Sequence, residues 1–137
     1  MARRVFLSFV AEDLQLVNAF RGQAKSEKSD LEFSDHSVKE PFDSTNAEYI
    51  RRQIREKISG VSVTVCLIGY TTASSKWVDW EIRTSDALGK GLVGVRLHSS
   101  AKDVPPKALK DAGAEVIDWD VKKIVAAIER AAKAAGY

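Results

Sequence analysis

The sequence predicts an α/β fold in which one open parallel sheet carries helices on both faces. Short apolar runs typical of strands alternate along the chain with segments that have helical spacing. One run, residues 61–69, is apolar almost throughout, as in a strand covered on both faces. The length of 137 residues, 45% of them hydrophobic, suits one core, so we expect a single domain over residues 1–137.

The first half of the chain contains two strand–helix pairs. Residues 4–9, RVFLSF, are rich in Phe and Val and predict a buried strand, and residues 11–26 have apolar positions at helical spacing. Residues 31–35 predict a brief strand, which a polar loop follows. Residues 46–59 place isoleucines on one face and basic residues on the others, which indicates an amphipathic helix with a solvated basic side.

The second half continues the alternation after the apolar run. The spacing predicts a helix over residues 74–89 and a strand over residues 91–97. Residues 98–113 show little helical pattern and contain two adjacent prolines. Residues 114–119 then predict a fifth strand, and the alanine-rich residues 121–135 predict a terminal helix.

Right-handed crossovers between these strands favour a flavodoxin-like strand order of 2-1-3-4-5. In such sheets ligands bind beyond the carboxyl ends of the strands, where the order reverses between strands one and three. The loops at that crevice are residues 9–13, 35–44 and 70–75. The predicted helix over residues 74–89 begins at the last of these loops.

A carboxylate, Glu81, falls within the apolar arc of that helix. At 100° per residue it lies between Trp77 and Val78, on the side that should face protein. The apolar arc also holds Trp80, Ile82, Ala87 and Leu88, and the opposite side holds Asp79, Arg83 and Asp86. Two explanations remain open: a paired structural carboxylate, or a functional one that a pocket in the crevice reaches.

Composition excludes several classes of function. Lys and Arg total 21 against 19 Asp and Glu, a net charge of +2 that lacks the basic excess of a nucleic-acid binder. The single cysteine, Cys66, lies in an apolar run, and the two histidines, His36 and His98, have no neighbouring ligand cluster, so we expect no disulfide and no metal site. No segment resembles a signal peptide or a membrane span, so we expect a cytoplasmic protein without membrane contact.

Three segments of the chain, VFLSFVAED (5–13), FSD (33–35) and SVTVCLIGYTTASSKWVDWEI (62–82), resemble parts of TIR domains. VFLSFVAED (5–13) resembles their first strand, and FSD (33–35) is similar to the start of their BB loop. SVTVCLIGYTTASSKWVDWEI (62–82) resembles the third strand and the Ser-x-Trp-x-x-x-Glu segment of NAD-cleaving TIR enzymes. Within that superfamily, the pieces most resemble the TIR-like proteins of the bacterial Thoeris anti-phage system. The resemblance covers roughly residues 4–97.

The resemblance implies site residues. Glu81 matches the catalytic glutamate, Ser8 and Phe9 match the floor of the nucleotide pocket, and Trp77 matches the aromatic four residues earlier. The loop over residues 35–42 departs from the TIR pattern because it lacks the usual glycine. Together with the crevice, the resemblance gives these substrate-binding residues: Ser8, Phe9, Asp35, Ser75, Trp77 and Trp80.

One carboxylate suits the chemistry that the resemblance implies. Nicotinamide leaves NAD as a neutral molecule, so no general acid is needed at the bond that breaks. An anionic group beside the ribose stabilises the oxocarbenium-like charge, more effectively where water is scarce. We therefore expect NAD as substrate, no cofactor or metal, and a cyclic ADP-ribose-type product that acts on a separate effector protein.

The alternatives are binding modules. A non-catalytic TIR-like module would bind a protein or nucleotide, and either version allows self-association or a phage-derived trigger. A phosphoacceptor receiver domain would need an aspartate at the end of strand three, where this chain has Ile68, Gly69 and Tyr70. A flavin-binding domain would need a small, hydroxyl-rich phosphate loop after strand one, which SFVAED does not supply.

Overall fold

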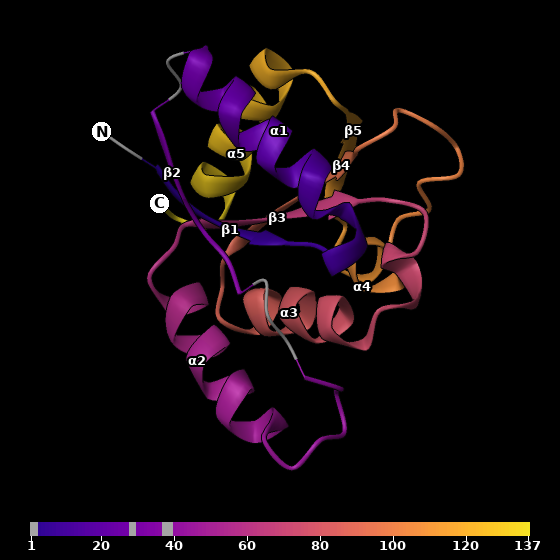
Figure 1. Cartoon of the computed structure of the whole chain (residues 1–137). Helices are drawn as coiled ribbons and strands as arrows, with labels where there is room; N and C mark the ends of the chain where they lie inside the picture. The colour runs from indigo at the N-terminus through magenta and orange to yellow at the C-terminus, as the bar shows by residue number, and fades with distance from the viewer. Residues whose placement is uncertain (1–2, 28–29, 37–39) are drawn as a thin grey trace.

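A computed structural model describes residues 3–27, 30–36 and 40–137 of the chain, which form one five-stranded sheet (Figure 1). The strand order β2-β1-β3-β4-β5, with parallel pairing throughout, confirms the predicted topology. The strands are β1 Arg3–Ser8, β2 Leu31–Ser34, β3 Val63–Ile68, β4 Gly91–Arg96 and β5 Glu115–Asp118.

Helices cover both faces of the sheet. α1 and α5 pack on one face, and α2, α3 and α4 lie on the other (Figure 1). The α-helices are α1 Leu14–Ser26, α2 Ala47–Ser59, α3 Lys76–Ala87, α4 Lys107–Asp111 and α5 Val121–Ala134. Two short 3₁₀ turns, η1 Ala11–Asp13 and η2 Thr72–Ser74, precede α1 and α3.

The central strand β3 is buried along its whole length, as its continuous apolar run predicts. Its side chains alternate between two cores. Val63, Val65 and Leu67 face α1 and α5, whereas Cys66 and Ile68 face α3 and α4. The sheet thereby separates the two cores. Successive residues of a strand point alternately into one core and the other.

Two details of the helices differ from the sequence expectation. The segment over residues 98–113 contains α4, a single five-residue helix that Pro106 precedes and whose Leu109 is fully buried. Ala87 and Leu88 lie on the predicted apolar arc of α3 but are exposed, Leu88 by 39%. Ala87 is the last residue of α3 and Leu88 is its C-cap, so both lie where the helix ends.

The close approach of β4 and α5 depends on a glycine. A Cβ at Gly91 would lie 2.6 Å from the carbonyl oxygen of Ala131 on α5. Because that atom belongs to the backbone, it cannot move aside without a shift of the whole helix. Glycine at the start of β4 therefore fixes how closely α5 packs on the sheet.

Candidate functional site

Glu81 is fully buried between α3 and the sheet. Its carboxylate Oε1 accepts a hydrogen bond of 2.6 Å from the Ser8 hydroxyl at the end of β1. Its buried neighbours along α3 belong to two apolar clusters: Trp77 packs in a cluster that includes Phe6, and Val78 packs in another. The carboxylate that the sequence places on an apolar face is thus held inside the protein by a residue that the TIR resemblance also singles out.

A second buried polar contact anchors the next turn of α3. The Ser85 hydroxyl donates to the Glu81 carbonyl oxygen at 2.7 Å and lies 2.7 Å from the Thr64 hydroxyl of β3. Ser85 has one hydroxyl proton, so Thr64 must be the donor to Ser85. These two hydroxyls fix the rotation of α3 over the sheet, and the sequence signal for them is a serine four residues after Glu81.

Ser75 begins the helix that carries Glu81. Its hydroxyl oxygen accepts from the Val78 N–H at 3.2 Å, so Ser75 is the N-cap of α3. In the preceding turn, the Thr72 hydroxyl oxygen accepts from the Gly69 N–H at 2.8 Å. The hydroxyl predicted to bind substrate therefore contributes to the geometry of the helix start in this structure.

A short segment after β2 covers Trp77. The Trp77 indole N–H donates to the Glu40 carbonyl oxygen at 2.7 Å, and the Phe42 ring meets Trp77 edge-on at 5.0 Å. Arg51 of α2 lies 4.4 Å from the Phe42 ring centre and donates to the Phe42 carbonyl oxygen at 3.0 Å. We call residues 40–43 the strap, because these contacts fasten them across the start of α3.

The remaining predicted residues divide between the two faces. Trp80, half-buried, meets Trp77 edge-on at 6.2 Å on the α3 side. Phe9 belongs to the core under α1 and α5, on the opposite face from Ser8. Asp35 forms an ion pair with Arg21 of α1. The structure therefore gathers Ser8, Trp77 and Trp80 around Glu81 but does not bring Phe9 or Asp35 to it.

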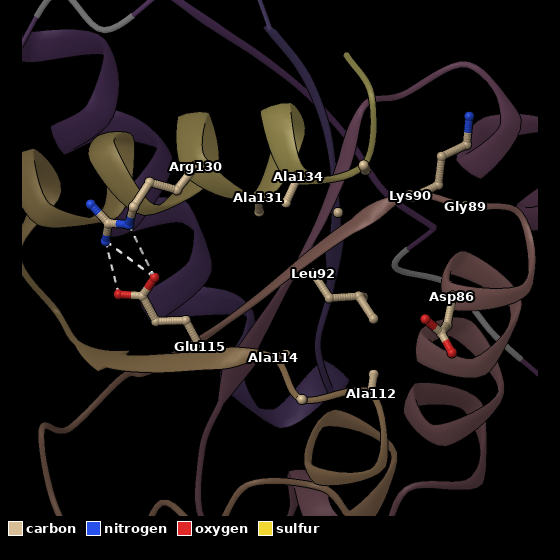
Figure 2. A pocket seen from close by; sticks show the side chains of 13 residues that line it. Asp86, Gly89, Lys90, Leu92, Ala112, Ala114, Glu115, Arg130, Ala131 and Ala134 are labelled. Carbon is tan, nitrogen blue, oxygen red and sulfur yellow. Dashed lines mark hydrogen bonds and ion pairs between the residues drawn. The ribbon is translucent and has the colours of Figure 1, made fainter.

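Three cavities in the described part of the chain lie elsewhere. The cavity in Figure 2, of about 440 Å³, opens at the amino end of β4, where Leu92 forms part of its lining and Arg130 pairs with Glu115. The others, of about 580 and 320 Å³, flank the edge strand β2. Their linings contain neither Glu81 nor the two tryptophans, so Glu81 is sealed in this conformation.

A carboxylate also lies at the carboxyl edge of the sheet. The Asp13 side chain packs against Gly69, where a Cβ would overlap it, and its Oδ2 is buried with no hydrogen-bond partner among the described residues. Burial raises the pKa of the Asp13 carboxyl above its ordinary value, nearby His98 lowers it, and the Glu12 and Asp103 carboxylates raise it further. The ionised form of Asp13 therefore costs stability.

Asp13→Asn is expected to raise the melting temperature at pH 7. An acid whose pKa is raised on folding favours the native state when protonated, and that contribution is lost as the pH rises. The gain should shrink as the pH falls toward the ordinary aspartate value of about 3.9, where the wild-type group is also neutral. Thermal unfolding of both proteins across this pH range measures this gain, with Glu56→Gln, a change at an exposed carboxylate on α2, as control. An equal gain at every pH would contradict the ionisation argument.

The family model of the Thoeris protein ThsB, TIR-like domain, matches residues 6–102, which include both Ser8 and Glu81. The chain belongs to this family. A ThsB-family relative from Bacillus cereus (strain MSX-D12), ThsB1, is named for a proposed cyclic ADP-D-ribose synthase activity and is 32% identical over 103 residues. That match covers 72% of this chain and 54% of the relative, so the chain spans about half the relative's length.

Two solved structures resemble this ThsB-family chain more distantly. The TIR domains of the activated Roq1 resistosome, which recognises the pathogen effector XopQ, are 16% identical over 98% of this chain and 84% of theirs, with a TM-score of 0.49. The crystal structure of CapF with the inhibitor 3-isopropenyl-tropolone is 9% identical over 84% of this chain and 30% of that chain, with a TM-score of 0.48. The fold assignment rests instead on the sheet order and the ThsB family match.

Among the residues that the structure describes, no group of three or more His, Cys, Asp or Glu side chains is arranged to hold a metal ion. Within the same residues, no helix has the length and apolar content needed to cross a membrane. Metal-independent chemistry remains a prediction.

Proposed function

We propose that this protein cleaves NAD at the bond between the nicotinamide nitrogen and the ribose, with Glu81 as the catalytic carboxylate. The observation that carries the proposal is the buried Ser8–Glu81 hydrogen bond beside the crevice between β1 and β3. Membership of the ThsB family, with a relative named for proposed cyclic ADP-D-ribose synthesis, supports the substrate class.

The environment of Glu81 suits the stabilisation of a ribosyl cation. As the bond breaks, its electron pair goes to the nicotinamide nitrogen, and positive charge develops on the ribose. A carboxylate acts strongly on that charge where protein replaces water, because the effective dielectric constant is lower there. The Ser8 hydroxyl orients the carboxylate through Oε1, and we assign Ser8 a positioning role.

Substrate access requires a conformational change near Trp77. Glu81 has no exposed surface, and Trp77, one helical turn before it, is only 8% exposed. The strap holds Trp77 in place through Glu40 and Phe42. We therefore assign the conformation seen here to the resting protein, and we propose that movement of the strap opens a path to Glu81.

Arg51→Ala is expected to loosen the strap and speed nicotinamide release. The change removes the guanidinium that stacks on the Phe42 ring and donates to the Phe42 carbonyl. Hydrogen exchange of residues 40–44 should accelerate, and nicotinamide release should rise with it. Arg52→Ala, an exposed arginine on the same helix, is the matched control. Faster exchange without any rise in release would show that the strap does not control access.

The proposed product is a cyclic ADP-ribose isomer. Cyclisation outcompetes water only if a second nucleophile of the same molecule is held against the ribosyl carbon, where effective molarities reach roughly 10⁵ M. The aromatic surroundings of Glu81, formed by Trp77 and Trp80, would exclude water once the substrate is bound. Mass spectrometry distinguishes the two products, because the cyclic product is one water lighter. Linear ADP-ribose alone would leave a simple NAD hydrolase.

A non-catalytic TIR-like module remains the second candidate, because the complete burial of Glu81 also suits a purely structural carboxylate. Release of nicotinamide from NAD by the purified protein separates the two candidates. Under the enzymatic proposal, a phage-derived trigger or self-association would open the site, and the product would act on a separate effector protein. Adding a lysate of phage-infected cells to the purified protein tests for such a trigger.

A further inference from the structure

An exposed aromatic ring lies at the carboxyl edge of the sheet, away from Glu81. Tyr70 follows β3 and is 58% exposed. Its ring stacks on the imidazole of His98, with ring centres 4.0 Å apart and planes within 11° of parallel. An exposed tyrosine ordinarily samples several rotamers, so this stacking keeps a flat aromatic surface in one orientation.

His98 is itself held rigidly. The Asp103 carboxylate accepts from the His98 backbone N–H and lies within hydrogen-bond distance of His98 Nδ1, both at 2.7 Å. Asp103 is fully buried, so this contact receives little competition from water. The Tyr70 ring therefore stacks on an imidazole whose position is fixed by two contacts with Asp103.

The Asp13 carboxylate lies beside this stacked pair. It packs against Gly69, the residue before Tyr70, and interacts electrostatically with His98. Its buried Oδ2 has no hydrogen-bond partner within the described residues. A flat ring and a carboxylate with acceptor capacity to spare thus occur together where open parallel sheets bind their ligands.

The separation from Glu81 matches a two-part ligand. Ser8, which hydrogen-bonds to Glu81, pairs with Cys66, and Tyr70 lies four residues further along the chain. At about 3.3 Å per residue, the stacked pair lies roughly 13 Å beyond the Ser8–Glu81 hydrogen bond along the strands. A dinucleotide carries two ribose–base units joined by a pyrophosphate, so one molecule can occupy both places.

We propose that Tyr70, supported by His98, binds the adenine ring of the substrate, and that Asp13 accepts from the hydroxyls of the adenosine ribose. This inference rests on the proposed NAD cleavage for its substrate, but the Tyr70 ring is exposed while Glu81 is still sealed. The adenosine half can therefore bind first. A phosphate on the ribose 2′ oxygen would meet the Asp13 carboxylate, so the site rejects NADP.

The first test measures adenosine binding by NMR, through the ring signals of His98. Adenosine is expected to shift these signals, and Tyr70→Ala should weaken binding about tenfold, the loss of one base stack. Tyr70→Phe keeps the ring and should bind nearly as wild type does. Tyr49→Ala removes another exposed tyrosine, on α2, and is the matched control. Adenosine 2′-phosphate (2′-AMP) should bind the wild-type protein more weakly than adenosine does. Asp13→Asn should reduce that difference in affinity between the two ligands.

The second test separates this inference from NAD cleavage itself. Tyr70→Ala should raise KM for NAD about tenfold with kcat unchanged, and should leave nicotinamide mononucleotide, which lacks adenosine, unaffected. Adenosine that fails to bind, or that binds Tyr70→Ala as tightly as wild type, overturns the adenosine site. Adenosine binding without nicotinamide release from NAD keeps the site and rejects the proposed cleavage.

Discussion

Glu81→Gln is expected to lower nicotinamide release from NAD by roughly 10²- to 10³-fold, the loss typical for one electrostatic stabiliser of a transition state. Glutamine has nearly the same shape, and its side-chain oxygen can accept from Ser8 as the carboxylate does. The charge at the reacting ribose is therefore removed while the packing of α3 remains. The comparison is made under conditions in which the parent protein turns over, with thermal unfolding measured alongside.

The surface carboxylate Glu56 provides the control, because it is exposed on α2. Glu56→Gln should keep full activity. A Glu81→Gln protein that releases nicotinamide at the parent rate would reject the catalytic assignment and leave Glu81 as a structural carboxylate. If Glu81→Gln both lost activity and had a greatly lowered melting temperature, misfolding would explain the lost activity. Ser8→Ala would then test the orientation of Glu81 separately.

Trp77→Ala is expected to be the most destabilising substitution near the site, by about 3–5 kcal/mol of unfolding free energy. Trp77 packs in a cluster with Phe6 and Ile54, and it also donates to the Glu40 carbonyl and supports Phe42. Removal of the indole leaves a cavity and releases the strap at once. Chemical denaturation measures the loss, with Trp80→Ala as the half-buried comparison on the same helix.

Trp77→Phe separates the ring from the hydrogen bond. It keeps most of the apolar packing but loses the donor to Glu40, which should cost about 1 kcal/mol. This milder variant is the suitable one for testing whether an opened pocket shifts the product toward linear ADP-ribose. A Trp77→Ala protein as stable as Trp80→Ala would contradict the central packing role of Trp77.

The sequence was informative about the fold wherever periodicity was sustained. The continuous apolar run of β3 and the spaced isoleucines of α2 predict elements that the structure contains. α4 has only five residues, too few to repeat a helical pattern, so its burial of Leu109 is a tertiary effect that local spacing does not reveal. Exposure of Ala87 and Leu88 likewise depends on where α3 ends, which the helical spacing does not reveal.

The site was only partly predictable, because its contacts join distant segments. Glu81 and Ser8 come from spacing and resemblance, but the Arg51–Phe42 contact and the Thr64–Ser85 contact need the packed fold. The sequence could have predicted that the Asp35 side chain points toward α1. Phe33 packs toward α1, and a residue two positions further along an extended chain points the same way.

The bond between Ser8 and Glu81 links residues separated by 73 positions in the chain. Such a contact closes only after β1 and β3 have paired and α3 has docked, and contacts of high sequence separation form slowly because loop entropy is lost first. During refolding, helical signal should therefore return before nicotinamide release does. Recovered activity would report completion of the whole sheet, which would make the Ser8–Glu81 contact an internal marker of the last cooperative step of folding.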